Sequence, residues 1–202
     1  MSGFDPATLD FYATEAPVYA ASGPDGIARH LPEFLDRLPS GSRILELGCG
    51  GGRDAFHMLA RGFDVDPTDG TVEIAAQAAV RIGRPVRVMR FDELDCIAEY
   101  DAVVASASLL HVPRADLPSI VQKIWTTLKP DGWHIASFKG GGLEGRDSFG
   151  RYFNYFEADE LRLIYTNACH WDELHIQSGI GGGYDGKQGP WHTITVHKAA
   201  LS

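Results

Sequence analysis

The sequence has few cysteines, no long apolar run and no cluster of basic residues. Its three cysteines, Cys49, Cys96 and Cys169, are widely spaced and odd in number, which favours neither a disulfide framework nor a structural metal site. No stretch approaches the about 20 apolar residues of a membrane span, and Met1 to Asp10 lack the pattern of a secretory signal. We therefore expect a cytoplasmic protein that binds neither a metal ion nor a membrane.

The charge balance argues against nucleic acid as a partner. Lysine and arginine together number 18 against 27 acidic residues, so the formal net charge is −9. Such a chain repels a phosphate backbone unless a local basic patch overrides the field. With 202 residues, of which 44% are hydrophobic, the chain is long enough for one domain with a sizeable core. We expect a single domain over residues 1–202 and a small-molecule substrate.

Apolar periodicity predicts an α/β fold in which strands and helices alternate. Several of the apolar runs, such as residues 101–105, show no polar alternation, which is typical of parallel strands covered on both faces. Asp5-Pro6 favours a helix start, and Pro17 should limit how far that helix runs unkinked. Glycine-rich loops are expected at 140–145 and at 179–189, the second as a mobile hairpin loop. The predicted strands are 44–47, 63–68, 86–91, 102–105, 134–138, 174–177 and 193–196, and the predicted helices include 27–38, 54–61, 72–82, 117–128 and 157–168.

A glycine loop follows the first predicted strand, with the sequence Glu46-Leu47-Gly48-Cys49-Gly50-Gly51-Gly52. Such a loop lets the backbone and the free N–H groups of the next helix approach a ligand closely. The dinucleotide fingerprint fails here, because its last small position is occupied by Arg53. Glu46 suits a cationic amino group, and Asp69 can accept both hydroxyls of an unphosphorylated ribose. Each feature alone has a plain structural reading, as a tight turn or a helix cap.

Taken together, these residues resemble the class I S-adenosylmethionine-dependent methyltransferases, with weaker similarity to the tellurite-resistance type in residues 145–153 and around Trp191. The resemblance implies a Rossmann-like three-layer sandwich with a mostly parallel seven-stranded sheet and an antiparallel last strand. It divides the domain into an N-terminal helical cap segment (1–41), a cofactor-binding core (42–139) and an acceptor-side C-terminal part (140–202). It also implies S-adenosyl-L-methionine as cofactor. The implied cofactor-binding residues are Glu46, Gly48, Gly50, Gly52, Asp69, Gly70, Asp92, Glu93 and Ser106.

Residues on the acceptor side are less strongly indicated. His111 follows the fourth predicted strand and is a candidate base, although it could equally orient the next helix. Arg151 and Tyr152 could bind a polar acceptor, or Arg151 could be paired locally. Tyr12 and Tyr19 could close over the cofactor, or could be packing aromatics. The segment 106–110 lacks the Asn/Asp-Pro-Pro-aromatic tetrad of enzymes that methylate base amines or glutamine amides.

The expected reaction is an in-line transfer of a methyl group to a small-molecule acceptor. Because the donor is already an electrophile, alignment and exclusion of water can suffice without a recognisable catalytic base. Two alternatives remain open: a non-catalytic S-adenosylmethionine-binding regulatory module and, less favoured, a nicotinamide-dependent oxidoreductase. The sequence does not predict the acceptor or the oligomeric state.

Overall fold

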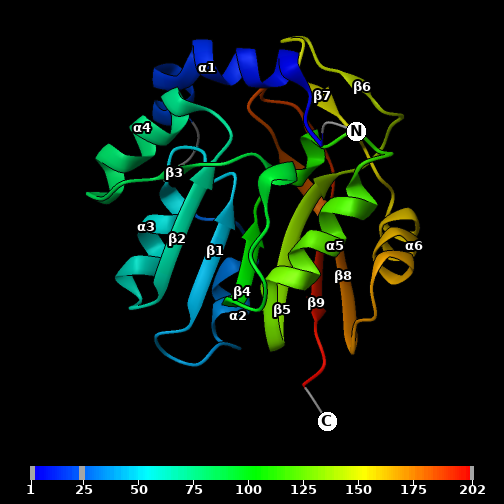
Figure 1. Ribbon diagram of the computed structural model, residues 1–202. Helices are drawn as coiled ribbons and strands as arrows, with labels where there is room; N and C mark the ends of the chain where they lie inside the picture. Colours follow the sequence, from blue (N-terminus) through cyan, green and yellow to red (C-terminus); the bar gives the residue numbers. More distant parts are fainter. Residues whose placement is uncertain (1–2, 23–25, 201–202) are drawn as a thin grey trace.

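A seven-stranded sheet forms the centre of the molecule, seen edge to edge in Figure 1. The computed structural model describes residues 3–22 and 26–200. The strand order is β3-β2-β1-β4-β5-β9-β8, and β9 runs antiparallel to both of its neighbours. This confirms the predicted mostly parallel sheet with an antiparallel last strand. The strands are β1 (Arg43–Leu47), β2 (Asp64–Asp69), β3 (Arg87–Val88), β4 (Tyr100–Ala105), β5 (Leu128–Lys139), β8 (Glu173–Gly182) and β9 (Gln188–His197).

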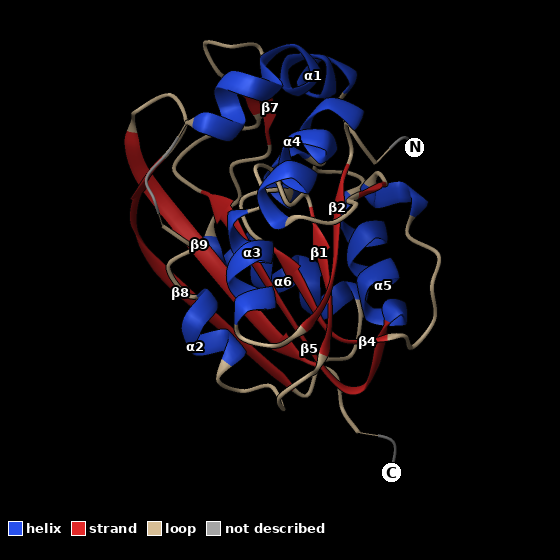
Figure 2. Cartoon of the chain, turned by 90° about the vertical axis from the view of Figure 1, so that its left-hand side faces the viewer, coloured by secondary structure: helices blue, strands red, loops and turns tan. Residues whose placement is uncertain are grey.

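Helices cover both faces of the sheet and complete three layers (Figures 1 and 2). Alternate residues of β1 divide between two apolar cores: Ile44 packs with α2 and α3, whereas Leu45 and Leu47 pack with α5 and α6. No helix in the described part of the chain is long and apolar enough to cross a bilayer. The covering helices are α2 (Leu31–Leu35), α3 (Arg53–Ala60), α4 (Val72–Ile82), α5 (Leu117–Thr127) and α6 (Ala158–Ala168).

Helix α1 (Pro6–Ala21) lies across the carboxyl ends of the strands, at the top of Figure 1. Asp5 caps it as predicted, because its Oδ1 accepts from the Thr8 N–H at 2.9 Å. The helix continues through Pro17 to Ala21, further than the sequence indicated. A proline removes one backbone hydrogen bond, and the packing of α1 against α4 offsets that loss.

Elsewhere the structure departs from the predicted boundaries in four places. The helix predicted at 27–38 is confined to α2, and the strand predicted at 86–91 to β3, after which η1 (Phe91–Glu93) begins. The strand predicted at 134–138 begins earlier, since β5 starts at Leu128 and contains an irregularity, with Asp131 at φ +65° and a register shift against β4. Much of the loop predicted at 179–189 is paired, since β8 and β9 form a long hairpin with a tip at 183–187. A small hairpin, β6 (Gly145–Arg146) with β7 (Tyr152–Phe153), was not predicted.

Parallel pairing brings the carboxyl ends of four strands to one edge of the sheet. The glycine loop follows β1 there, and β2 ends at Asp69. Ser106 follows β4, and β5 ends at Lys139. Because α1 lies over this edge, it encloses the polar groups that the strands present.

Candidate active site

The glycine loop takes a path that side chains would obstruct. Gly48 has φ +73°, and a Cβ atom there would lie 2.6 Å from the Cβ of Ser108. Gly52 has φ +76° and caps α3, where an added Cβ would lie 3.2 Å from Ala78 of α4. Gly48 thus permits close approach to the segment after β4, whereas Gly52 permits close packing of α3 and α4.

Asp69 joins the glycine loop to the end of β2. One carboxylate oxygen accepts from the Gly50 N–H, and the other accepts from the N–H and hydroxyl of Thr71, all at 3.1 Å. Burial raises the pKa of Asp69 from 3.8 to about 6, against the opposing effect of these hydrogen bonds. The carboxylate is therefore held in place at a cost that a polar ligand beside it could reduce.

Two further carboxyl groups lie near the same loop. Alternation along β1 directs Glu46 to the α3 side of the sheet, where Asp54 lies in the first turn of α3. Burial, followed by the charges of Asp54 and Asp69, raises the pKa of Glu46 well above its usual value. Its Oε2 atom has no hydrogen-bond partner among the described residues. Burial also raises the pKa of Asp54, whose Oδ1 accepts from the Ala28 N–H at 3.0 Å. A cation bound beside these groups would favour their negatively charged forms and so lower the raised pKa values.

An inner cavity of about 80 Å³ lies between this edge of the sheet and α1. Predicted residues from four separate segments meet in it, namely the glycine loop, the end of β2, η2 (Leu109–His111) and α1. The lining residues are Phe4, Thr8, Leu9, Tyr12, Tyr19, Gly48, Gly50, Asp69, Gly70, Ile74, Arg90, Phe91, Ala107, Ser108 and His111.

His111 is held between a backbone carbonyl and a tyrosine. Its Nδ1 lies 2.6 Å from the Tyr152 carbonyl oxygen, and its Nε2 lies 2.9 Å from the Tyr12 hydroxyl. A carbonyl only accepts, so Nδ1 carries the proton and Nε2 accepts from Tyr12. Burial lowers the pKa of His111 to about 4, which makes the ring neutral at pH 7.

Arg151 links the Tyr12–His111 pair to the carboxylate of Asp147. It donates to the Tyr12 hydroxyl at 3.1 Å, and its Nε and Nη2 donate to Asp147 Oδ2 at 3.0 and 2.7 Å. Both residues of this ion pair are almost fully buried. The guanidinium carbon also lies within 6 Å of the ring centres of Phe11, Tyr12, Phe149, Phe153 and Tyr184.

A larger outer cavity of about 700 Å³ shares Tyr12, Tyr19 and His111 with the inner one. The predicted residues Ser106 and Arg151 line it. The side chain of Ser106 also acts to lower the pKa of Asp54, against the larger effect of burial. Aromatic rings and two cations from the C-terminal half of the chain also line the outer cavity, and we call them its far wall: Lys139, Arg151, Phe153, Tyr184 and Trp191.

Five of the predicted residues line neither cavity. Two of them, Glu46 and Gly52, belong to the glycine-loop region described above, where Glu46 is a buried carboxyl group with a raised pKa and Gly52 permits close packing of α3 and α4. The cofactor-binding role predicted for these two residues stays a prediction.

The other three, Asp92, Glu93 and Tyr152, pair with neighbouring side chains. Asp92 and Glu93 contact Arg90 at 3.3 and 2.8 Å, and the residue that lines the inner cavity beside Arg90 is Phe91. The Tyr152 hydroxyl donates to a carboxylate oxygen of the 140–145 loop at 2.6 Å. The cofactor and acceptor roles predicted for these three residues stay predictions. The adjacent residues Phe91, Arg151 and Phe153 line the cavities instead.

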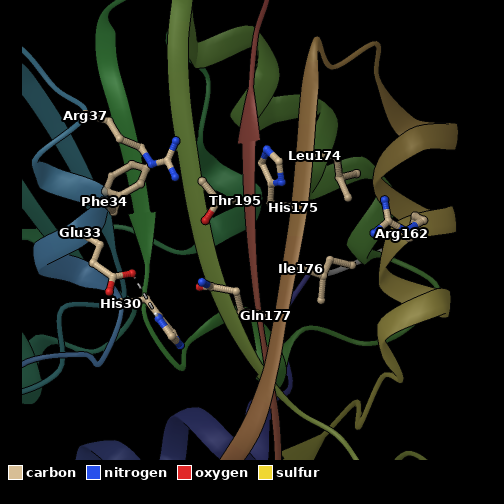
Figure 3. Close-up of a pocket in the computed structure, with 10 residues that line it drawn as sticks. All are labelled: His30, Glu33, Phe34, Arg37, Arg162, Leu174, His175, Ile176, Gln177 and Thr195. Carbon is tan, nitrogen blue, oxygen red and sulfur yellow. Dashed lines mark ion pairs between the residues drawn. The ribbon is translucent and has the colours of Figure 1, made fainter.

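A third hollow of about 320 Å³ lies away from this edge, between the α2 segment and the β8–β9 hairpin. Figure 3 shows His30, Glu33 and Arg37 on one side, facing His175 and Gln177 on the other. His30 and Glu33 form an ion-pair contact at 3.9 Å. The glycine loop and Asp69 do not border this hollow, so we place the site at the inner and outer cavities.

Comparison with known proteins identifies the family of the chain. A family model described as a methyltransferase domain matches residues 19–166. The chain belongs to this methyltransferase family. Residues 19–166 include the glycine loop, Asp69 and His111, so the matched region contains much of the lining of the cavities described above.

Relatives of this methyltransferase include enzymes named for their pathway. The ubiquinone biosynthesis O-methyltransferase of Chromobacterium violaceum is 34% identical over 110 residues, which are 50% of this chain and 47% of that protein. The chain spans about half the length of the curated relatives it matches.

Solved structures share the fold of the chain. A Methanosarcina mazei S-adenosylmethionine-dependent methyltransferase has a TM-score of 0.73 at 18% identity, covering 84% of this chain and 98% of its own. A Burkholderia thailandensis 1,6-didemethyltoxoflavin-N1-methyltransferase with bound S-adenosylhomocysteine has a TM-score of 0.66 at 23% identity, covering 84% and 76%.

The methyltransferase site includes residues that the sequence did not identify. Phe4 and Leu9 come from the N-terminal segment, and Lys139 and Tyr184 come from the C-terminal half of the chain. Phe91 had a detectable signal, because it directly precedes the predicted Asp92. Phe4, Leu9, Lys139 and Tyr184 had no such signal, since an isolated apolar residue or lysine forms no spacing pattern.

Proposed function

We propose that the chain transfers a methyl group from S-adenosyl-L-methionine to a small-molecule acceptor. The observation that carries this proposal is the group of buried carboxylates around the glycine loop of a methyltransferase-family domain. Glu46 leaves one oxygen without a hydrogen bond in the described structure. A cation beside these groups would lower their raised pKa values and favour their ionised forms.

The residues present fit this cofactor. Asp69 would bind the ribose hydroxyls, and Gly70, Ile74 and Phe91 would surround the base. Glu46 and Asp54 supply negative charge for the amino group of the methionine moiety. When bound, the cofactor supplies a methyl group already activated on a sulfonium. The protein's own contribution is then alignment of the acceptor and exclusion of water.

Tyr12, Tyr19 and His111 border both cavities and are positioned to perform these tasks. The two tyrosines close the site from α1, and their rings contact each other at 4.9 Å between centres. A hydroxyl or amine acceptor loses a proton as it is methylated. In the proposed mechanism the Tyr12 oxygen takes that proton while the Tyr12 hydroxyl proton moves to His111 Nε2, so that charge and protons balance. We call these two proton transfers the Tyr12–His111 relay.

Cofactor binding is tested first, by calorimetry with S-adenosylhomocysteine. We expect saturable binding by the wild-type protein and weaker binding by Asp69→Ala, because two hydroxyl contacts are lost. Asp64→Ala is the matched control, since Asp64 is an exposed carboxylate at the start of the same strand. Equal affinity of wild type and Asp69→Ala would show that the proposed site is wrong.

Methyl transfer is tested separately with labelled S-adenosylmethionine and a metabolite mixture. Transfer of label to an acceptor supports the enzyme, whereas saturable binding without transfer would support the binding-only alternative. Tighter binding of a nicotinamide dinucleotide than of S-adenosylhomocysteine would favour the oxidoreductase.

A further inference from the structure

The outer cavity indicates which chemical class of acceptor the site takes. We propose that the acceptor is an aromatic carboxylate and that Lys139 binds its carboxylate group. This inference rests on the proposed function, because it assigns the acceptor end of the same site.

The ammonium group of Lys139 is a buried cation with an incomplete partner. Its side chain is 13% exposed, and its nearest carboxylate oxygen is Asp185 Oδ1 at 3.8 Å, longer than a hydrogen bond. Burial lowers the pKa of Lys139. An ammonium group has three donors, and a buried cation is costly unless it is paired and hydrogen-bonded. The position therefore favours an additional anion.

Arg151, the other cation of this wall, does not offer the same opportunity. Asp147 receives two hydrogen bonds from it, and Tyr12 receives a third. Five rings surround its guanidinium, which leaves the Arg151 charge satisfied within the protein. The contrast assigns the anion-binding role to Lys139.

The walls next to Lys139 favour a planar acceptor. Lys139 Nζ lies 4.6 Å from the ring centre of Phe153 and 5.9 Å from that of Trp191, and both rings line the outer cavity. Tyr12 and Tyr19 line the boundary with the inner cavity. An aromatic ring can stack or make edge contacts with such side chains. A single ammonium matches one carboxylate better than a doubly charged phosphate, which would leave negative charge uncompensated.

Charge is also divided along the site. Asp54 and Asp69 lie at the glycine loop, where Arg53 also lines the outer cavity and donates to the Ser22 carbonyl oxygen, and Lys139 lies at the far wall. A cationic donor is favoured at the first end and an anionic acceptor at the second. The same division disfavours a cationic amine as acceptor, because Lys139 would repel it.

Asp185 is the carboxylate that lies beside Lys139 where we expect the acceptor carboxylate to bind. It lies at the tip of the β8–β9 hairpin, and its side chain is 10% exposed. The adjacent Tyr184 contacts the rings of Phe11 and Tyr19 of α1. We expect the acceptor carboxylate to replace Asp185 at Lys139, so removing the Asp185 charge should strengthen acceptor binding.

The experiment compares acids with their neutral esters. Protein saturated with S-adenosylhomocysteine is titrated by calorimetry with 4-hydroxybenzoate and 3,4-dihydroxybenzoate, and with the methyl ester of each. Wild type should bind at least one acid about tenfold to a hundredfold more tightly than its ester, the range expected for a hydrogen-bonded charge pair. Lys139→Gln should abolish this preference, Lys139→Arg should retain much of it, and Asp185→Asn should increase it.

Lys187→Gln is the matched control, because it removes an exposed lysine from the same hairpin. It should leave the preference unchanged. Binding of S-adenosylhomocysteine to each variant verifies that the site is folded. If this binding fails in wild type, the proposed function fails. If it succeeds while wild type shows no preference for either acid, or Lys139→Gln keeps the preference, only the assignment of an aromatic carboxylate is overturned.

Discussion

Replacing Asp69 with asparagine should change how the stability of the protein depends on pH. Burial raises the pKa of Asp69 from 3.8 to about 6. Since one pH unit of displacement corresponds to about 1.4 kcal/mol, ionised Asp69 lowers the free energy of unfolding by about 3 kcal/mol relative to a carboxyl whose pKa folding leaves unchanged. This cost affects the protein without a bound ligand.

The direction of this pH dependence follows from comparing the Asp69 carboxyl in the folded and the unfolded protein. Below pH 3.8 the carboxyl is protonated in both the folded and the unfolded protein, and the cost is absent. As the pH rises, the unfolded chain ionises first, so wild type loses stability until the pH passes about 6. About half of the roughly 3 kcal/mol should develop between about pH 5 and about pH 7.5. The asparagine side chain of Asp69→Asn does not ionise, so the variant should gain on wild type over this interval.

Urea unfolding of both proteins at several pH values measures the effect. The informative quantity is the pH dependence of the difference, because replacing one acceptor oxygen by an NH2 group removes the acceptor of either Gly50 or Thr71 and lowers the stability of the variant by a constant amount. Asp64→Asn, which removes an exposed carboxylate from the same strand, is the control. A difference that stays constant from about pH 5 to about pH 7.5 would refute the reasoning.

Three further substitutions test other parts of the site. Tyr12→Phe keeps the ring but removes the hydroxyl that bonds to His111, so kcat should fall about a hundredfold while calorimetry shows little change in donor affinity; an unchanged kcat would contradict the relay. Gly48→Ala would place a Cβ 2.6 Å from Ser108, and it should weaken S-adenosylhomocysteine binding more than a substitution outside the loop. Leu161→Ala, in the fully buried core of α6, should lower the free energy of unfolding by about 2 to 5 kcal/mol while the donor dissociation constant of the folded protein stays the same.

The alternation of strands and helices in the central part of the chain could be predicted because local sequence patterns indicate each element. The apolar runs of β1 and β4, each beside a turn or glycine loop, indicate covered parallel strands. Their parallel alignment then brings Asp69 and His111 to the glycine loop, although they are far apart in the sequence. The meeting of these residues thus follows from the fold class itself.

Other features depend on tertiary contacts that leave no local pattern. Glycines at 179–182 favour a loop, yet they form part of β8 because β9 supplies a continuous antiparallel partner. Pro17 favours a helix end, yet packing against α4 keeps α1 intact. The pairing of Tyr12 with Arg151 joins residues 139 positions apart, which no spacing argument indicates.

The placement of α1 links access to both cavities. The inner cavity, at about 80 Å³, is smaller than the about 300 to 1,000 Å³ of small-molecule sites, so a nucleoside cofactor needs either the adjoining outer cavity as well or the movement of a wall. Helix α1 forms one of these walls, and it is held by the Asp5–Arg146 ion pair, by the hydrogen bonds of Tyr12 with His111 and Arg151, and by packing against α4. The Asp5 side chain is only 12% exposed and accepts two hydrogen bonds from Arg146, so this ion pair also contributes to holding α1 in place. Since Tyr12 borders both cavities, its displacement would open the donor and acceptor sites together.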